Sequence, residues 1–304
     1  MGVRWVSTAT GSGPPPWVLA VAAMLSVQLG SALSTDLIAT AGAGGTAWLR
    51  LSIGAIVFLV IARPPLRSLR PADLPALLGL GITTGLQTVA FLAAIVRIPL
   101  GTCVAIEFLG PLTVAAVRSR SLRSLAWPAL ALLGVVLLTS PWAGVVDPLG
   151  VMWAALAAVG WGVYIVLTQR VGDRFAGIRG LSLTVPVAAL TAAVVGVPEA
   201  AGHLTLDVLL AAAGLALLLP VLPYALEMLA LRRMNPAAFG TLMALEPAIG
   251  LVLGLLVLRQ VPTPLQVLGI VLVVLAGAAA QRAPEARRPE PVRPVVPPEL
   301  DALG

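Results

Sequence analysis

Three glutamates stand inside long apolar stretches of this 304-residue chain, where a charged side chain is unexpected: Glu107, Glu227 and Glu246. An ionised carboxylate in such surroundings is costly, so it must face protein, water or a cation. A carboxyl group there can hold or release a proton as a cavity opens and closes. If the chain moves a substrate across a membrane, such groups can couple the entry of a proton to the exit of the substrate, and this role is predicted for Glu107 and Glu246. The alternative for all three is a structural role as protonated hydrogen-bond donors between helices.

Five further polar residues lie within or at the ends of apolar stretches. Arg50 could bind a substrate carboxylate with two hydrogen bonds, or it could lie at the membrane interface with its charge in water. Gln28 and Gln87 could line a polar cavity or form hydrogen bonds between helices. Tyr164 and Tyr224 could contact a substrate or anchor helix ends at the interface.

The composition requires that lipid surrounds most of the chain. The sequence is 59% hydrophobic and 11% charged, against about 25% charged in soluble domains. A membrane-spanning helix needs about 20 apolar residues. The pattern predicts an all-α integral membrane protein with ten spans, at 17–38, 46–62, 73–96, 100–117, 125–140, 149–168, 180–197, 206–231, 237–258 and 264–280.

Arginine positions predict the orientation of these spans. All 19 cationic residues are arginines, and positive charge concentrates in cytoplasmic connections. With the N-terminus inside, only Arg50, Arg97 and Arg259 lie near the outer side, while outer connections carry Asp147 and Glu199. Both termini are therefore predicted to be cytoplasmic.

An internal repeat relates the two halves of the chain. The segments 101–107 and 240–246 share the pattern Gly-Thr-x-x-Ala-aliphatic-Glu, and a proline follows each glutamate. They fall in the fourth and ninth spans, so the repeats have five spans each and opposite orientations in the membrane. Gly101 and Gly240, each four residues before an alanine, are predicted to let helices approach closely.

This repeat defines the predicted domains. Residues 17–140 form the first five-helix repeat and 149–281 the second. The tails 1–16 and 282–304 are rich in proline and are predicted to be disordered cytoplasmic segments.

Several function classes are excluded by what the sequence lacks. A net charge of +6 suggests nucleic-acid binding, but the arginines are dispersed between apolar runs rather than clustered. One cysteine and one histidine exclude a disulfide and Cys- or His-rich metal sites. A chain without lysine has no ATP-binding P-loop. We expect no metal and no cofactor, with protons as the coupling ion.

Two regions resemble EamA-type carriers of the drug/metabolite transporter superfamily, and most closely the threonine and homoserine exporter subfamily. They are 222–231 (LPYALEMLAL) and 239–248 (FGTLMALEPA), with supporting matches at 24–30, 99–101, 107–111, 161–164 and 169–170. The resemblance covers roughly residues 15–281. It implies ten spans in two inverted repeats, a location in the bacterial plasma membrane, and efflux of small amino acids or related metabolites by proton antiport.

Two alternatives to amino-acid export stay open from the sequence. One is a carrier for another metabolite or a cationic drug, with the glutamates as partners of the cation. The other is a membrane-embedded enzyme, which is disfavoured because the spans contain no nucleophile–base pair, aspartate pair or metal ligands. The partners expected are a small molecule and the lipid bilayer, and the sequence leaves a homodimer open.

Overall fold

The computed structural model describes residues 14–63, 69–119, 125–143, 146–172, 175 and 177–282, and within these ranges all regular structure is helical. The predicted all-α class is confirmed. Seven helical stretches of the described chain are long and apolar enough to cross a membrane when consecutive helices such as α3 and α4 are taken together, and two shorter apolar helices accompany them. Residues 1–13 and 283–304 of the predicted tails lie outside the described residues.

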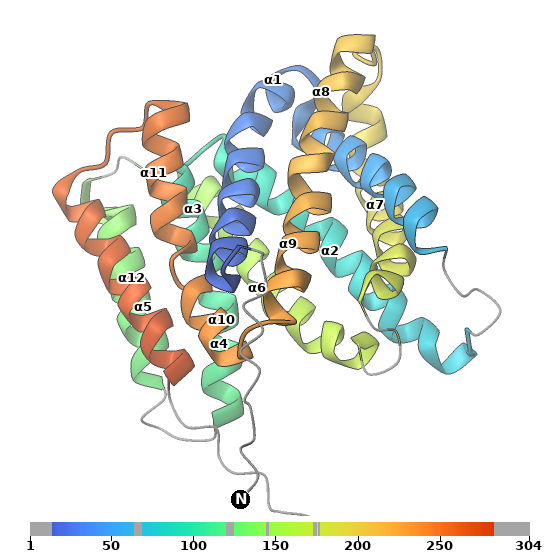
Figure 1. Ribbon diagram of the computed structural model, residues 1–304. Coiled ribbons are helices and arrows are strands. Elements are labelled where there is room, and N and C mark those ends of the chain that lie inside the picture. Colours follow the sequence, from blue (N-terminus) through green and yellow to red (C-terminus); the bar gives the residue numbers. More distant parts are fainter. Residues whose placement is uncertain are drawn as a thin grey trace, which may run out of the picture.

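Helix α1 (Pro16–Ala62) contains the first two predicted spans in 47 residues. It is interrupted at Gly42, whose φ of 76° and ψ of 168° are accessible essentially to glycine alone. Figure 1 shows the two arms running in opposite directions from this turn. We call residues 16–41 the first arm and 43–62 the second arm. The two spans predicted at 17–38 and 46–62 are thus continued as helix up to Gly42 from either side, because one glycine suffices to reverse the chain.

The other helices follow the predicted order of apolar stretches. They are α2 (Leu74–Ile95), α3 (Leu100–Glu107), α4 (Leu109–Ser119), α5 (Ala126–Thr139), α6 (Pro148–Gly172), α7 (Ile178–Ala200), α8 (Leu206–Ala216), α9 (Leu222–Leu231), α10 (Pro236–Met243), α11 (Glu246–Leu258) and α12 (Pro264–Arg282). Short 3-10 helices lie at Pro71–Asp73 and Pro141–Ala143, and a π-helical segment, Leu217–Val221, joins α8 to α9.

Three stretches predicted as continuous spans are broken in the middle: α3 from α4, α8 from α9, and α10 from α11. Each break follows the residue four before a proline: α3 ends at Glu107 before Pro111, α8 at Ala216 before Pro220, and α10 at Met243 before Pro247. Proline lacks the N–H that would bond that residue's carbonyl oxygen. A helix can continue past proline, as α7 does, so proline permits these breaks rather than enforcing them.

Glycines bring the helices into close contact. Closely packed pairs include the second arm of α1 with α7, α2 with α6 and α7, α3 with α11, and α5 with α12. A Cβ atom at Gly134 of α5 would lie 2.6 Å from the backbone oxygen of Gly269 of α12, and the reverse distance is the same. A Cβ atom at Gly101 of α3 would lie 2.9 Å from the Cα atom of Leu251. These backbones therefore approach as closely as small residues allow.

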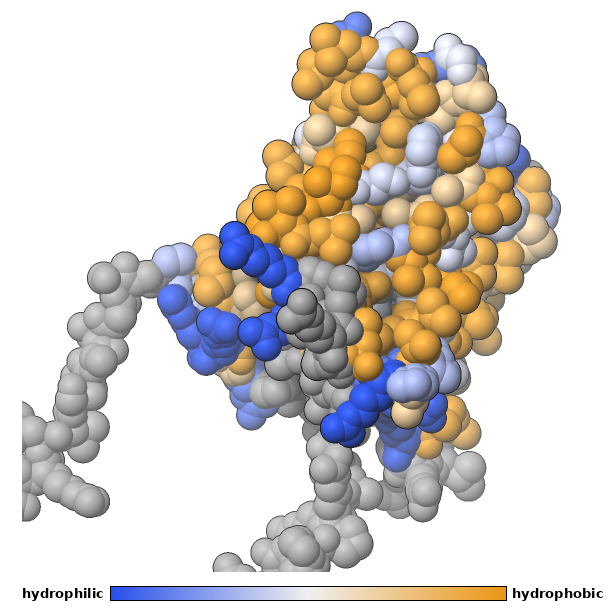
Figure 2. Space-filling view, turned by 90° about the vertical axis from the view of Figure 1, so that its right-hand side faces the viewer, coloured by the Kyte–Doolittle hydropathy of each residue, from blue (hydrophilic) through white to orange (hydrophobic). Residues whose placement is uncertain are grey.

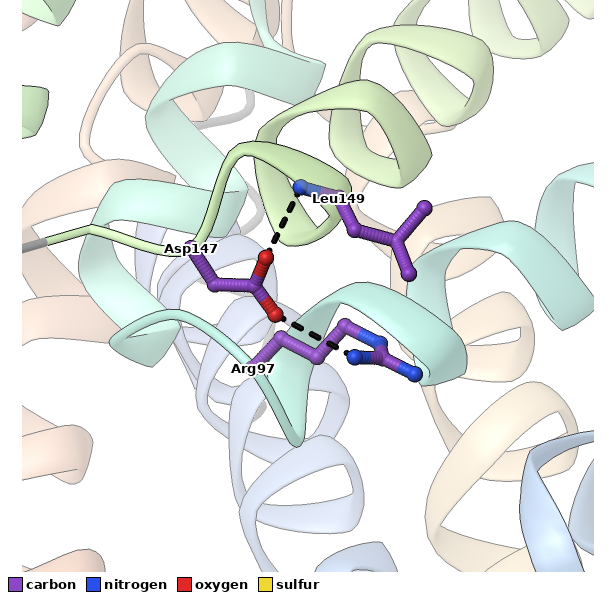
Figure 3. A network of polar contacts seen from close by, with 3 residues as sticks. All are labelled: Arg97, Asp147 and Leu149. Carbon is purple, nitrogen blue, oxygen red and sulfur yellow. Dashed lines mark hydrogen bonds and ion pairs between the residues drawn. The ribbon is translucent and has the colours of Figure 1, made fainter.

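Hydrogen bonds join the connections at the upper end of Figure 1. Arg97 Nη1 lies 3.2 Å from Asp147 Oδ2, and the Leu149 N–H donates to Asp147 Oδ1 at 2.9 Å, which caps the start of α6 (Figure 3). The Leu149 amide and the Arg97 guanidinium hold the pKa of Asp147 below its usual value. At the same end, the Leu100 N–H that begins α3 donates to the side chain of Gln260 at 3.0 Å.

The turn at Gly42 is held in the same manner. Glu199, in the last turn of α7, accepts hydrogen bonds from the N–H groups of Gly44 at 2.7 Å and Gly45 at 3.2 Å. Its carboxylate thereby caps the start of the second arm, where the helix dipole favours negative charge. The sequence placed Glu199 in an outer connection and did not indicate this role.

The outer surface is that of a protein embedded in lipid. Apolar side chains cover most of the face in Figure 2, and strongly hydrophilic ones gather toward its lower end. Val194 is 77% exposed, Leu190 71% and Val60 70%. So much large apolar surface is unfavourable in water and favourable against lipid chains.

Candidate functional site

Two of the three glutamates lie at helix breaks. Glu107 is the last residue of α3, and Glu246 is the first residue of α11. Their exposed fractions are 9% and 4%. Because these helices are broken before Pro111 and Pro247, the repeated Gly-Thr-x-x-Ala-aliphatic-Glu pattern places each carboxyl group beside an interruption of the backbone rather than on a regular helix face.

The three acids form one group, which we call the acidic cluster: Glu107, Glu227 and Glu246. Glu246 lies near enough to the other two for their charges to interact. Glu227 comes from α9 and is half-buried. Within the described ranges, none of the three forms an ion pair with an arginine. Carboxyl groups from α3 and α9 therefore lie within electrostatic reach of Glu246 of α11, without an arginine partner in the described part of the chain.

Gln87 belongs to the same group. Its Nε2 donates to Glu107 Oε1 at 3.0 Å, although 20 residues separate them in sequence. Gln87 also packs against α6, since a Cβ atom at Gly160 would lie 2.9 Å from its Cβ atom. This contact connects the acidic cluster to α2 and α6.

Both tyrosines lie beside Glu227. Tyr164 of α6 and Tyr224 of α9 each interact electrostatically with its carboxyl group. Tyr224 also meets Phe58 of the second arm edge to face, with ring centroids 6.0 Å apart. The structure thus brings six predicted residues together, from α2, α3, α6, α9 and α11. Neither tyrosine anchors an outer helix end.

Gln28 lies in the first arm and faces α11. It is 2% exposed, and a Cβ atom at Gly250 would lie 3.6 Å from its Oε1 atom. That oxygen has no hydrogen-bond partner among the described residues. Two residues earlier on the first arm, the Ser26 hydroxyl donates to the Leu218 carbonyl at 2.7 Å. Leu218 lies in the α8–α9 break, so this hydrogen bond fixes the first arm beside the break.

Arg50 is buried, and an interfacial position with its charge in water is therefore wrong. Only 3% of the residue is exposed. Its Nη1 donates to the Ser34 hydroxyl of the first arm at 2.7 Å, while its Nε has no partner among the described residues. No carboxylate of the described chain lies within ion-pair distance of it. The close reversal at Gly42 brings the two arms together and so encloses Arg50 between helices.

Sequence reasoning missed Ser34 and Thr46, which accompany Arg50 and are fully buried. The signal available was helical spacing, since Thr46 precedes Arg50 by one turn. Ser34 could not be inferred, because its contact with Arg50 depends on the chain reversal at Gly42.

The two glycines predicted to let helices approach closely lie in different helices, Gly101 in α3 and Gly240 in α10. Gly101 packs against α11 as described, and Gly240 is half-buried.

Near the lower end, a cavity of about 350 Å³ lies between the start of α2 and the end of α6, lined by residues that include Asp73, Leu77 and Arg170. In the described part of the chain, no three His, Cys, Asp or Glu side chains are grouped closely enough to hold a metal ion.

Comparison with known proteins assigns this arrangement to a family. The sequence profile of the EamA-like transporter family matches residues 148–279. The threonine/homoserine exporter RhtA of Escherichia coli (strain K12) is 36% identical in an alignment of 271 positions that covers 86% of this chain and 89% of that protein. This chain belongs to the EamA-like transporter family. RhtA of Salmonella typhimurium (strain LT2) is 35% identical over the same shares.

A solved crystal structure, whose description names no function, has the same fold. It aligns with a TM-score of 0.58 at 21% identity, over 86% of this chain and 96% of that one. Membership of the EamA-like family, together with the apolar helices, makes this chain a multi-pass membrane transporter and not an enzyme. The predicted resemblance is confirmed, and the membrane-enzyme alternative is excluded.

Proposed function

We propose that the protein exports small amino acids of the threonine and homoserine type, or related metabolites, across the bacterial plasma membrane. The observation that carries this proposal is its 36% identity to a protein named as a threonine/homoserine exporter, over 89% of that protein's length. Since a chain without lysine has no P-loop, an ion gradient is the energy source in this proposal.

The proposed architecture is ten spans in two inverted repeats, 17–140 and 149–281. The packing of the helices supports it. Spans two and seven meet (the second arm and α7), as do four and nine (α3 and α11) and five and ten (α5 and α12). Span three packs on span six (α2 and α6). In the proposed repeats, span eight corresponds to span three and span one to span six, and these also pack together, as α8 and α9 on the first arm. When the two repeats exchange conformations, the central site opens first to one side of the membrane and then to the other, which is alternating access.

In this proposal the acidic cluster couples export to proton entry. Glu107 and Glu246 occupy equivalent places in the two repeats, but one ends a helix and the other begins one. Since the helix dipole favours negative charge at a helix start and disfavours it at a helix end, the two acids differ electrostatically. Rearrangement of the repeats would change the water around each acid, and with it the site that holds the proton.

The proposed orientation has both termini in the cytoplasm. The described arginines at the ends of α4, α6 and α9 support it, since these ends lie at the lower side of the molecule in Figure 1. Asp147 and Glu199, which bind the opposite connections, then face the outside.

A second candidate function is transport of a cationic metabolite or drug. The observation that favours it is the acidic cluster itself, because three carboxyl groups within the described chain lack an arginine partner. In this case the cluster would bind the cargo directly rather than a proton.

Reconstituted vesicles can test both candidates. With a pH gradient imposed, labelled threonine, homoserine, serine and a panel of organic cations are offered as cargo. We expect gradient-driven transport of an amino acid by the wild type, and loss of the gradient dependence in Glu107→Gln and Glu246→Gln. Asp207→Asn, at an exposed acid in the first turn of α8, is the matched control and should behave as wild type.

The outcomes separate the proposals. Failure with every amino acid, alongside transport of a cation, would replace the export proposal by the second candidate. Amino-acid transport that keeps its gradient dependence in both glutamine variants would refute proton coupling by the acidic cluster.

A further inference from the structure

Unsatisfied polar atoms are concentrated on α1. Of the four buried side-chain atoms without a hydrogen-bond partner in the described chain, three belong to this helix: Gln28 Oε1, Thr46 Oγ1 and Arg50 Nε. Thr46 and Arg50 are one turn apart and therefore share a face of the second arm. Buried polar groups are normally paired, so unpaired ones call for a ligand or an explanation.

Arg50 is the costliest of these groups. A guanidinium keeps its charge at any physiological pH, and burying an unpaired charge is strongly unfavourable. The hydrogen bond from Nη1 to the neutral Ser34 hydroxyl, at 2.7 Å, supplies no negative charge. Neither the described part of α1 nor the described helices packed on it place a carboxylate within ion-pair distance of Arg50. The site is therefore complementary to an anion that the described chain does not provide.

Arg50 also lies on the face of the second arm that leads to the acidic cluster. Along the same face of the second arm, Gly54 packs against Pro220 in the α8–α9 break, with 3.2 Å between a Cβ atom there and the proline ring. One turn further, Phe58 meets Tyr224 beside the acidic cluster. Given the rise of a helix, Arg50 lies about 6 Å outward of the break.

Two hydrogen bonds and a packing contact connect Arg50 to the same break. The Ser34 hydroxyl that accepts from Arg50 donates to the Gly30 carbonyl at 2.6 Å. Gly30 in turn packs against Leu218, whose Cβ atom would lie 3.3 Å from a Cβ atom at Gly30. Interrupted helices at mid-membrane are where transporters of this architecture place substrate contacts.

We propose that Arg50, held in place by the Ser34 hydroxyl, binds the carboxylate of the transported molecule together with the Thr46 hydroxyl, on the outer side of the α8–α9 break. This inference rests on the proposed function and names the chemical group that the carrier recognises. The guanidinium supplies two parallel N–H donors, a geometry that fits a carboxylate, and the Thr46 hydroxyl is free to add a third. A carboxamide of the same shape lacks the charge, so the carrier discriminates against it.

The test compares L-threonine with L-threonine amide in two assays. In vesicles, the wild type is expected to transport threonine, and Arg50→Gln to raise its KM by about 10- to 100-fold, as loss of a charged hydrogen bond does. Thr46→Val, which keeps the shape and removes the hydroxyl, should raise the KM by several fold. Arg50→Lys retains the charge without the planar fork and should keep part of the preference for the carboxylate.

The second assay needs no transport. Thermal unfolding of the detergent-solubilised protein is followed with L-threonine, L-lactate and their amides. Carboxylates should raise the melting temperature of the wild type more than the amides do, and the difference should vanish in Arg50→Gln. Ser34→Ala serves as the control for a purely structural brace, because it removes the bond to Arg50 but leaves the guanidinium in place.

Three outcomes decide the matter. If the wild type treats carboxylates and amides alike in the melting assay, the carboxylate site is refuted. If Ser34→Ala and Arg50→Gln lower stability equally and neither changes the preference for carboxylates, Arg50 is a brace and the inference also fails. If carboxylates stabilise the wild type through Arg50 but no amino acid is transported, the site stands and the amino-acid export proposal falls.

Discussion

The turn at Gly42 allows a quantitative test of how the two arms of α1 are held together. In Gly42→Ala, the new Cβ atom would overlap the carboxylate of Glu199 and lie 2.9 Å from its Cδ atom. Glu199 must then move and lose its hydrogen bonds to the amides of Gly44 and Gly45. A non-glycine residue at φ 76° costs about 1–3 kcal/mol, and loss of a helix cap about 0.5–2 kcal/mol. We expect Gly42→Ala to lower the free energy of unfolding by about 1.5–5 kcal/mol.

A double-mutant cycle separates these two contributions. In a Glu199→Ala background the cap is already absent, so Gly42→Ala should cost only the backbone strain, and the coupling energy should be about 0.5–2 kcal/mol. The measurement is reversible denaturation in mixed micelles. Gly214→Ala is the matched control, because its Cβ atom would meet nothing within 4 Å. The reasoning is refuted if Gly42→Ala is no more destabilising than Gly214→Ala, or if the two mutations are additive.

Three other predictions concern stability at the connections and in the core. The lowered pKa of Asp147 means that its ionised form stabilises the fold above about pH 4 and that this contribution is lost as the pH falls through the lowered value. Asp147→Asn should therefore weaken the pH dependence of the melting temperature on the acid side. Gly134→Val places atoms against the backbone oxygen of Gly269 and should cost about 1–3 kcal/mol in the micelle assay; an unchanged stability would contradict the close packing of α5 and α12. Gln87→Leu removes the donor to Glu107 and should cost about 1–3 kcal/mol, whereas a neutral result would mean that another donor replaces it.

Residue type alone was enough to select the acidic cluster. An acid in an apolar stretch is conspicuous because lipid cannot solvate it, so Glu107, Glu227 and Glu246 could be named without coordinates. The same reasoning identified Gln87 as polar but not its partner, since a hydrogen bond across 20 residues requires knowledge of how α2 and α3 pack.

Arg50 illustrates a residue whose environment this reasoning left open. A lone arginine near the end of an apolar stretch has two environments compatible with its sequence, the interface or the interior. The choice depends on how sharply the chain turns before it. Because Gly42 reverses the chain at one residue, the first arm lies against Arg50 and excludes water.

The sequence by itself determined the membrane class, the order of the apolar helices and the acidic residues within the spans, because lipid imposes one local rule on every residue of a span. The three breaks also have a local cause in Pro111, Pro220 and Pro247, although proline marks where a helix can break and not whether it does. Tertiary structure alone decided which helices meet, where Arg50 lies and that Glu199 caps the second arm. These depend on contacts between residues distant in the chain, and no pattern along the sequence encodes such distances.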